Sequence, residues 1–278
     1  MATPKITLIV SARIFFILTI VLAGCTSSRI VLPDGSGEPF LNYKEVFDVA
    51  VNACSRVRTV ELMMTVKGQT RDSTLRGQTR VALMQPGFLR LEALAPFGPP
   101  GFVLIAEDDN AVLLLPRENR VVTDASSSEL LKLLAGVSLT PSDFRALLTG
   151  CLVPEPRPLV AWTYGKNWIG IELVGDATLY LRRFEGIPRI VAGMRRGLMV
   201  EYLDYMREFP RRIHIQTIGP RSVETDLTAT LSQMSINIEI DRRAFVPNVP
   251  GNFIPMSLEE FRGITGQPEG AQPFSAVP

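Results

Sequence analysis

The chain has 278 residues, with 29 Lys and Arg, 28 Asp and Glu and a single His, and its formal net charge is +1. This balance lacks the basic excess that binding to nucleic-acid phosphates requires, so we expect no nucleic-acid partner. One imidazole cannot form a His-based metal cluster, and neither Cys-x-x-Cys nor Gly-x-Ser-x-Gly occurs. We therefore expect no metal site, no cofactor and no catalytic residue, and a protein that is not an enzyme.

An apolar segment near the start of the chain ends at a cysteine. Lys5 and Arg13 come first, residues 14–22 are apolar, and two small residues stand directly before Cys25. This order resembles the lipobox of bacterial lipoproteins, in which the cysteine becomes the lipidated N-terminus. The resemblance implies that residues 1–24 are a signal peptide and that Cys25 carries the lipid.

The lipobox resemblance also implies a location. A diacylglycerol with an added acyl chain anchors a protein more firmly than one chain can. Thr26 is not the Asp that retains such proteins in the inner membrane, so we expect an outer-membrane anchor facing the periplasm. The alternative is an uncleaved transmembrane helix over residues 6–24, which is nearly long enough to cross a bilayer but carries Arg13 in its middle.

Helix signals are few and well separated. Residues 25–40 are rich in Ser, Gly and Pro and are predicted to link the lipid to a domain at 41–246. In that domain an Asn, Ser or Thr is followed three residues later by Glu or Asp at each of three places, as in helix N-caps. The predicted helices cover residues 42–57, 126–134 and 140–150.

Most of the remaining domain alternates apolar and polar residues with a period of two. The clearest runs are 60–66, 89–93, 227–231 and 234–240. Such runs predict an antiparallel sheet with one buried and one solvated face. We expect roughly ten or eleven strands, and a sheet of that size curls. The predicted fold is mainly β: a curled antiparallel sheet with a short helical lid.

Two cysteines remain after Cys25. Cys54 and Cys151 each fall at the end of a predicted helix, and disulfides persist in the periplasm. The sequence leaves two alternatives open, a disulfide between them or two buried thiols.

A curled sheet of this size has a long apolar concave face, and three short helices are too few to cover it. We therefore predict an apolar cavity that could hold acyl chains, with about 0.8 kcal/mol contributed by each buried methylene. The alternative is that large side chains fill the interior. The predicted wall and lid residues are Leu62, Met64, Leu89, Leu91, Leu130, Leu134, Phe144, Leu147 and Leu148.

The order and spacing of residues 87–151 resemble those of LolB-type outer-membrane lipoprotein receptors. The stretch begins Gly-Phe-Leu-Arg-Leu-Glu-Ala-Leu-Ala-Pro-Phe-Gly at residues 87–98 and ends Asp-Phe-Arg-Ala-Leu-Leu-Thr-Gly at residues 143–150. The resemblance implies the LolA/LolB fold, an incomplete antiparallel β-barrel with a helical lid over an apolar cavity. It also implies acyl chains of lipoproteins or lipids as ligands, and a LolA-like periplasmic carrier as donor.

In LolB-type proteins a Pro-Leu-Gly loop presents an apolar side chain that is implicated in handing lipid to the membrane. The matching triplet here is Pro96, Phe97 and Gly98, so the resemblance implies Phe97 as the residue that contacts membrane or acyl chain. The alternative is that Phe97 folds back against Phe102 or the sheet edge. The chain departs from the pattern by placing two further prolines after Gly98.

The end of the chain, residues 247–278, is again rich in Pro and Gly and is predicted to be a mostly extended tail with a short helical turn at 257–262. The whole pattern favours a monomeric outer-membrane lipoprotein that transfers acyl-bearing cargo to the membrane. The alternative is a structural or regulatory envelope lipoprotein that uses the same fold to bind protein.

Overall fold

The structure, a computed structural model, describes residues 30–220 and 222–265. The predicted signal peptide and Cys25 lie outside these residues, so both remain predictions. The chain divides into two units between residues 32 and 33, and the unit that begins at Pro33 holds the sheet and the helices. No helix in the described part of the chain combines the length and the apolarity needed to cross a bilayer.

The described residues from Pro33 onward form one sheet of 15 strands. In chain order the strands are β1 (Glu38–Pro39), β2 (Thr59–Thr70), β3 (Thr74–Met84), β4 (Phe88–Leu94), β5 (Val103–Glu107), β6 (Asn110–Leu115), β7 (Arg120–Ser126), β8 (Pro158–Tyr164), β9 (Trp168–Leu173), β10 (Ala177–Phe184), β11 (Ile187–Arg195), β12 (Leu198–Met206), β13 (Phe209–Ile218), β14 (Val223–Ile236) and β15 (Ile254–Met256).

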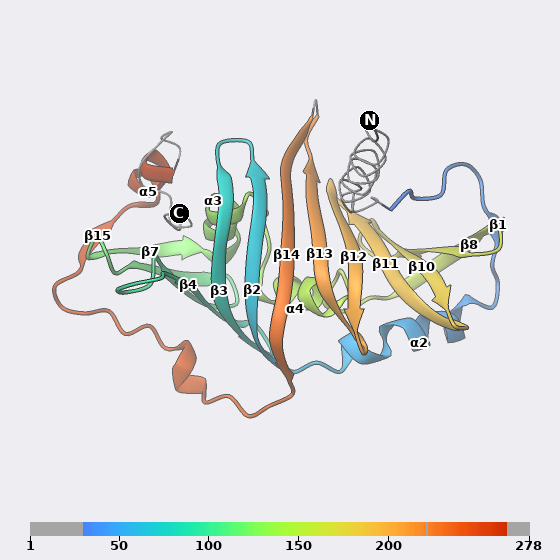
Figure 1. Cartoon of the computed structure of the whole chain (residues 1–278), viewed down its shortest axis with the longest axis horizontal. Helices are drawn as coiled ribbons and strands as arrows, with labels where there is room; N and C mark the ends of the chain where they lie inside the picture. The colour runs from blue at the N-terminus through green and yellow to red at the C-terminus, as the bar shows by residue number, and fades with distance from the viewer. Residues whose placement is uncertain (1–29, 221, 266–278) are drawn as a thin grey trace, which may run out of the picture. The chain divides into compact units, whose positions relative to one another are not determined.

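The strands are arranged in the order β1-β8-β9-β10-β11-β12-β13-β14-β2-β3-β4-β5-β6-β7-β15. All neighbours are antiparallel except β15, which runs parallel to β7. The order begins at β1 and ends at β15 without joining the two, so the sheet is not closed into a barrel (Figure 1). The predicted mainly β fold with one large antiparallel sheet and few helices is confirmed.

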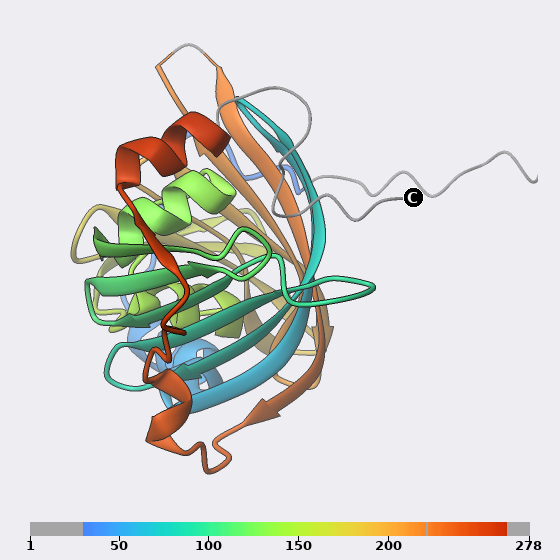
Figure 2. The same cartoon turned by 90° about the vertical axis from the view of Figure 1, so that its left-hand side faces the viewer.

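The helices are α2 (Tyr43–Ser55), α3 (Ser127–Ala135), α4 (Pro141–Thr149), α5 (Leu258–Thr265) and a 3-10 turn η1 (Arg242–Phe245). The sheet curls, and α3 and α4 lie inside its curve (Figure 2). α3 packs on β6 and β7, α4 packs on β4 and β13, and α2 packs on β8 and β11. Helices therefore cover the concave face at both ends of the sheet.

The predicted starts of α3 and α4 are confirmed by their caps. Ser126 accepts a hydrogen bond from Glu129 N while the Glu129 carboxylate accepts from Ser126 N, and Thr140 and Asp143 form the same reciprocal pair. Asn42 precedes α2 as predicted, but its side chain makes no capping hydrogen bond. Packing rather than capping therefore fixes the start of α2.

Gly136 ends α3 in a conformation that needs glycine. Its φ is +71°, in the left-handed region, and an added Cβ would lie 2.4 Å from the Thr225 hydroxyl oxygen. That hydroxyl donates to the Gly136 carbonyl oxygen at 3.2 Å. This close approach fixes the end of α3 against β14.

One core unites the sheet with the helices. Its buried apolar members come from α2, α3, α4, α5 and most strands, and all of them lie between Phe47 and Phe261. The unit that begins at Pro33 therefore contains every residue of its own core. A second, smaller cluster lies on β5, β6 and β7 and packs against Phe253: Val103, Ile105, Leu114 and Val121.

Two details of the sheet differ from the prediction. The sheet has 15 strands rather than ten or eleven, and two of the additional strands, β1 and β15, are too short to show alternation. The runs 227–231 and 234–240 do not form two strands, since β14 continues through an irregularity after Ser232 and ends at Ile236. Asn237 then adopts a φ of +56°, and its side chain accepts a hydrogen bond from Arg58 N at 2.7 Å.

The chain beyond residue 246 is also more structured than expected over its described part. β15 pairs with β7, and α5 contacts both β7 and α3. Ser257 caps α5, because its hydroxyl oxygen accepts from Glu260 N at 3.1 Å while the Glu260 carboxylate accepts from Ser257 N at 2.7 Å. Phe261 is 1% exposed, so residues 254–265 belong to the packed domain. At the other end, residues 38–39 of the predicted linker form β1.

Candidate functional site

The predicted contact loop joins β4 to β5. At its base Gly101 N donates to the Ala93 carbonyl oxygen at 2.9 Å, and Ala93 N donates to the Phe102 carbonyl oxygen at 3.0 Å. Phe102 is 1% exposed and belongs to the core. The loop therefore leaves a firmly held pair of strands.

Phe97 stands at the outer end of this loop and is 90% exposed. The structure places its side chain in solvent rather than back against the sheet. Gly98 has a φ of +79° and open space around it. The Arg117 guanidinium donates weakly to the carbonyl oxygens of Phe97 and Pro99, at 3.5 and 3.4 Å. In Figure 2 the blue-green loop between β4 and β5 projects beyond the convex face of the sheet.

The nine predicted wall and lid residues are brought together by the fold. Each of them is at most 8% exposed, and all belong to the main core. They come from β2, β4, α3 and α4, as expected. Within the described residues they belong to the packed interior, and their role as the wall and lid of an apolar cavity remains a prediction.

Three hollows occur elsewhere in the described part of the unit, and none is lined by any of those nine side chains. One, of about 290 Å³, lies where β5, β6 and β7 meet Phe245 and Pro247. A second, of about 400 Å³, is mainly polar and is lined by Asp34, Glu38 and Tyr164. The third, of about 30 Å³, lies beside Cys54 and has room for about one water molecule.

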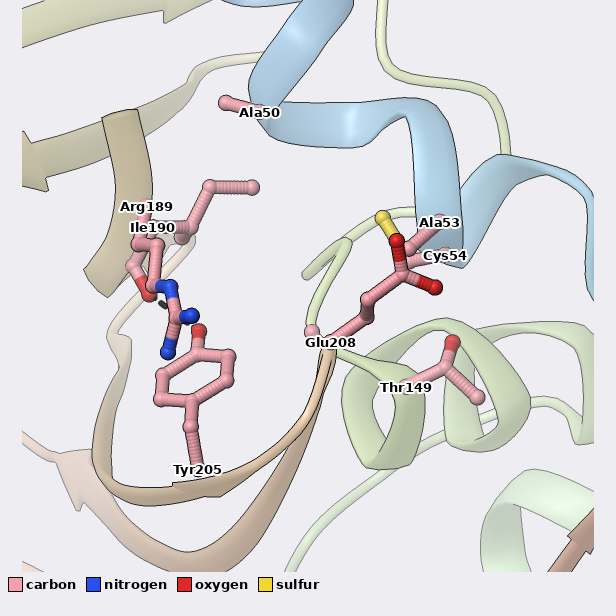
Figure 3. A pocket seen from close by; sticks show the side chains of 9 residues that line it. Ala50, Ala53, Cys54, Thr149, Arg189, Ile190, Tyr205 and Glu208 are labelled. Carbon is pink, nitrogen blue, oxygen red and sulfur yellow. Dashed lines mark hydrogen bonds between the residues drawn. The ribbon is translucent and has the colours of Figure 1, made fainter. Parts of the chain in front are cut away.

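Cys54 and Cys151 form a disulfide with their Cα atoms 5.6 Å apart. The bridge ties the end of α2 to the residue that follows Gly150 at the end of α4. Figure 3 shows the small hollow beside it, with Tyr205 and Arg189 on the opposite wall. The Arg189 guanidinium lies 5.4 Å from the centre of the Tyr205 ring, and the Tyr205 hydroxyl donates to the Ile190 carbonyl oxygen. Burial raises the pKa of Tyr205, so this hydroxyl stays protonated.

His214 has partners that the sequence did not reveal. It lies on β13 between Glu201 of β12 and Asp226 of β14: Nδ1 is 2.7 Å from a Glu201 carboxylate oxygen, and Nε2 is 2.8 Å from Asp226. Gln216 donates to the other Asp226 oxygen at 2.8 Å. The hydrogen bond to Glu201, followed by the one to Asp226, raises the pKa of His214.

This arrangement does not provide a catalytic base. Both imidazole nitrogens already face carboxylates, and the His214 side chain is only 8% exposed. Among the residues that the structure describes, no group of three or more His, Cys, Asp and Glu is arranged to hold a metal ion. The Glu201–His214–Asp226 cluster therefore acts as an ionic link across three strands, with Glu201 and His214 buried and Asp226 partly exposed.

Comparison with known proteins gives no family. No protein-family model matches the chain, and no curated protein matches its sequence. Among solved structures, a LolA superfamily protein from Nitrosomonas europaea is similar with a TM-score of 0.47 and 8% identity, covering 75% of this chain and 99% of that one. A DUF1329 family protein from Desulfovibrio piger has a TM-score of 0.49 and 12% identity, with coverage of 73% and 96%.

A third similar structure is the lipoprotein LppX of Mycobacterium tuberculosis, with a TM-score of 0.32, 12% identity, and coverage of 71% of this chain and 96% of that one. Scores and identities at this level do not establish a shared function.

Proposed function

We propose that this protein is an outer-membrane lipoprotein, anchored through Cys25, that binds acyl chains of lipoproteins or lipids and delivers them to the membrane. It acts as a monomer and without catalysis, and a LolA-like periplasmic carrier supplies the cargo. The observation that carries the proposal is the position of Phe97, a large apolar side chain 90% exposed at the end of a loop with a fixed base.

Delivery in this proposal needs no energy source. Cargo moves from carrier to receptor to bilayer because each step offers its acyl chains a better apolar environment. Each buried methylene contributes about 0.8 kcal/mol, so a few additional buried methylenes decide the direction of transfer. Phe97 provides the first apolar contact outside the domain.

Acyl binding requires space that the nine core side chains fill. In the proposed mechanism α3 and α4 therefore move away from the concave face when cargo enters, and Leu130, Leu134, Phe144, Leu147 and Leu148 exchange their contacts with the sheet for contacts with acyl chains.

The direct test is to purify residues 33–278, which retain the whole core and the disulfide, from bacterial cells and to analyse them by native mass spectrometry and lipid extraction. The proposal expects bound acyl lipid, or uptake when a lipoprotein or phospholipid is added. If neither occurs, acyl binding is refuted.

The role of Phe97 is tested by Phe97→Glu in a transfer assay from purified carrier to vesicles. Burying a Phe side chain contributes about 1.5 to 3 kcal/mol, so transfer is expected to fall about tenfold or more. Leu41→Glu is the matched control, because Leu41 is 86% exposed at a site remote from the loop in sequence. Equal transfer by both variants would contradict the role of Phe97.

A second candidate function is that of an envelope lipoprotein that binds another protein through the same fold. The observation that favours it is the packed interior, in which Leu130, Leu147 and Leu148 are completely buried. In this case the purified unit carries no lipid, and Phe97→Glu weakens binding to a protein rather than transfer to vesicles.

A further inference from the structure

The chain between β14 and β15 crosses the outer face of β4 to β7, which is the face turned away from α3 and α4. Its 3-10 turn, η1, contacts β4 and β5. The centre of the Phe245 ring lies 5.5 Å from that of Phe88, and the Arg90 guanidinium donates to the Ala244 carbonyl oxygen at 2.9 Å. In Figure 2 this orange-to-red segment passes in front of the green strands. The crossing segment is therefore fixed against the sheet at η1.

The crossing segment leaves a hollow of about 290 Å³ beside it. Phe245 and Pro247 bound the hollow on one side, and β5, β6 and β7 bound it on the other. Ile105 and Val112, which are paired across β5 and β6, give it an apolar floor. Ile105 is 2% exposed and Phe245 is 4% exposed, so both are held by packing. The hollow is therefore preformed.

The size of the hollow limits what it can hold. Pockets that enclose a whole small molecule measure roughly 300 to 1,000 Å³. This hollow is slightly smaller, and its rim residues Glu107, Thr123 and Pro247 are exposed. It therefore suits one large apolar side chain of a longer ligand.

The charge around the hollow is negative. Glu107 and Asp124 line it, and Asp108 and Asp109 form the adjoining turn between β5 and β6. Arg242 is the base beside them, and it pairs with Glu107 at 3.1 Å. Four carboxylates and one guanidinium leave a net charge of −3. The three aspartates are exposed and form no ion pair with another described residue, so their charges are available to a partner.

The charged groups next to this area do not offset its charge. The nearest ion pairs are neutral: Arg90–Glu92, Arg243–Asp241 and Arg262–Glu129. Arg80, on β3, also pairs with Glu92, at 3.3 Å. Arg120 is at the opposite end of β7 and lies near Glu260, whose pKa it helps to lower. The negative charge therefore remains when these neighbours are counted.

We propose that this hollow docks an extended segment of another protein, in which a large apolar side chain stands between lysine or arginine residues. The apolar side chain inserts between Val112 and Phe245, and the basic side chains reach Asp109 and Asp124. Complementary charges at the rim select the partner and speed its association. The chain's own residues 266–278 contain no Lys or Arg, so charge complementarity favours a separate protein.

This surface goes beyond the proposed function. The predicted acyl cavity lies on the other face of the sheet, where Ala106 and Ala111, the neighbours of Ile105 and Val112 along β5 and β6, belong to the main core. The loop that carries Phe97 precedes β5, whereas the hollow lies at the other end of that strand. Docking at the hollow therefore does not depend on acyl transfer.

The test measures binding of dye-labelled peptides to residues 33–278 by fluorescence anisotropy. The peptide Gly-Lys-Trp-Lys-Gly is expected to bind about tenfold or more tightly than Gly-Glu-Trp-Glu-Gly. The difference is expected to shrink below about twofold near 1 M salt, where charges are screened within a few ångströms. A third peptide with alanine in place of tryptophan is expected to bind about tenfold more weakly than the first, because it lacks the side chain that fills the hollow.

A pair of double variants tests the charges. Asp109→Asn with Asp124→Asn is expected to weaken binding of the basic peptide about fivefold or more. Asp72→Asn with Asp176→Asn is the control of equal charge change, at exposed turns elsewhere, and is expected to change binding less than about twofold. Asp124 and Asp176 have φ values of +55° and +57°, which asparagine also adopts, so the two double variants are matched in backbone geometry.

Val112→Trp tests the location, because the larger ring fills the hollow from its floor. This variant is expected to reduce binding of the basic peptide about tenfold or more, with thermal unfolding as the check on its fold. If it is unstable, the two double variants decide, since neither changes a packed side chain.

The outcomes separate this proposal from the proposed function. Equal affinity for the two charged peptides, or an equal loss in the two double variants, would overturn the docking site. A folded Val112→Trp variant that binds the basic peptide normally would overturn it too. Self-association of the unsubstituted protein in sedimentation that is lost in the Asp109 and Asp124 variant would assign the hollow to a second copy and overturn a separate partner. Bound acyl lipid tests the transfer function alone, whichever of these results is found.

Discussion

Removal of the disulfide between Cys54 and Cys151 is expected to destabilise the domain strongly. The bridge joins residues 97 positions apart. Closing a loop of this length reduces the entropy of the unfolded chain, and the chain-entropy relation gives about 4.7 kcal/mol for a loop of about 100 residues. Both cysteines are buried, so their replacement by alanine also removes two packed sulfur atoms and adds a packing cost of its own.

A loss of this size is readily measured by thermal unfolding. A domain of this size loses about 2 to 4 °C of melting temperature per kcal/mol, so reduction should lower the melting temperature by roughly 10 to 20 °C. Circular dichroism of residues 33–278 with and without dithiothreitol gives this difference. The double variant Cys54→Ala, Cys151→Ala should melt near the reduced protein and should not respond to dithiothreitol.

The reasoning would be refuted by a reduced protein that melts within about 3 °C of the oxidised one, since 1 kcal/mol or less would then be involved. It would also be refuted if the double variant melted near the oxidised protein. Either result would show that the unfolded chain gains little freedom when the bridge opens, for example because α2 and α4 remain associated.

Three further changes test other parts of the fold by urea unfolding. Leu147→Ala, at a side chain that is 0% exposed, should cost about 2 to 5 kcal/mol, and a cost below 1 kcal/mol would show that the interior collapses around the change. Thr140→Ala removes the cap of α4 and should cost about 1 kcal/mol, and no loss would show that the capping pair does not stabilise the helix. Because its carboxylate partners raise the pKa of His214, its stabilising contribution is complete below about pH 6.5 and is lost as the pH rises through the higher folded value. The unsubstituted protein should therefore lose more stability than His214→Gln between about pH 6 and pH 9, and equal losses would contradict the ionic link.

The helices near the middle of the chain could be predicted because their signals are local. Ser126 and Glu129, like Thr140 and Asp143, are three residues apart, and that spacing alone places the two capping hydrogen bonds. Asn42 shows the limit of the same signal, since the helix begins where expected but no capping bond forms.

The partners of His214 could not be predicted, because they depend on register. Glu201 is 13 residues away and Asp226 is 12, so the pairing of β12, β13 and β14 decides which polar side chains meet. That pairing includes irregularities after Tyr202 and around Asp204, which no alternation pattern indicates. The short β15 was missed for a related reason, as three residues cannot show a period of two.

The prediction of a cavity rested on how few helices could cover a large curled sheet. The area of a sheet and the number of its covering helices do not determine how large side chains interlock between them. Phe144 is 8% exposed and Leu148 is 0% exposed, so these two covering side chains are packed among the described residues, and the cavity remains a prediction. Exposure of Phe97 could be expected more directly, since neighbouring proline and glycine leave few side chains to shield it.

The two outermost strands of the sheet have a consequence for the protein in a crowded compartment. The outermost strand of a sheet has backbone N–H and C=O groups without a partner strand. Strands of other chains can pair with these groups, which leads to aggregation. Here one border consists of two residues and the other of three. Pro39 and Pro255 also remove an amide donor from each border. These short, proline-containing edge strands therefore limit edge-to-edge pairing of this large sheet with other β-rich proteins.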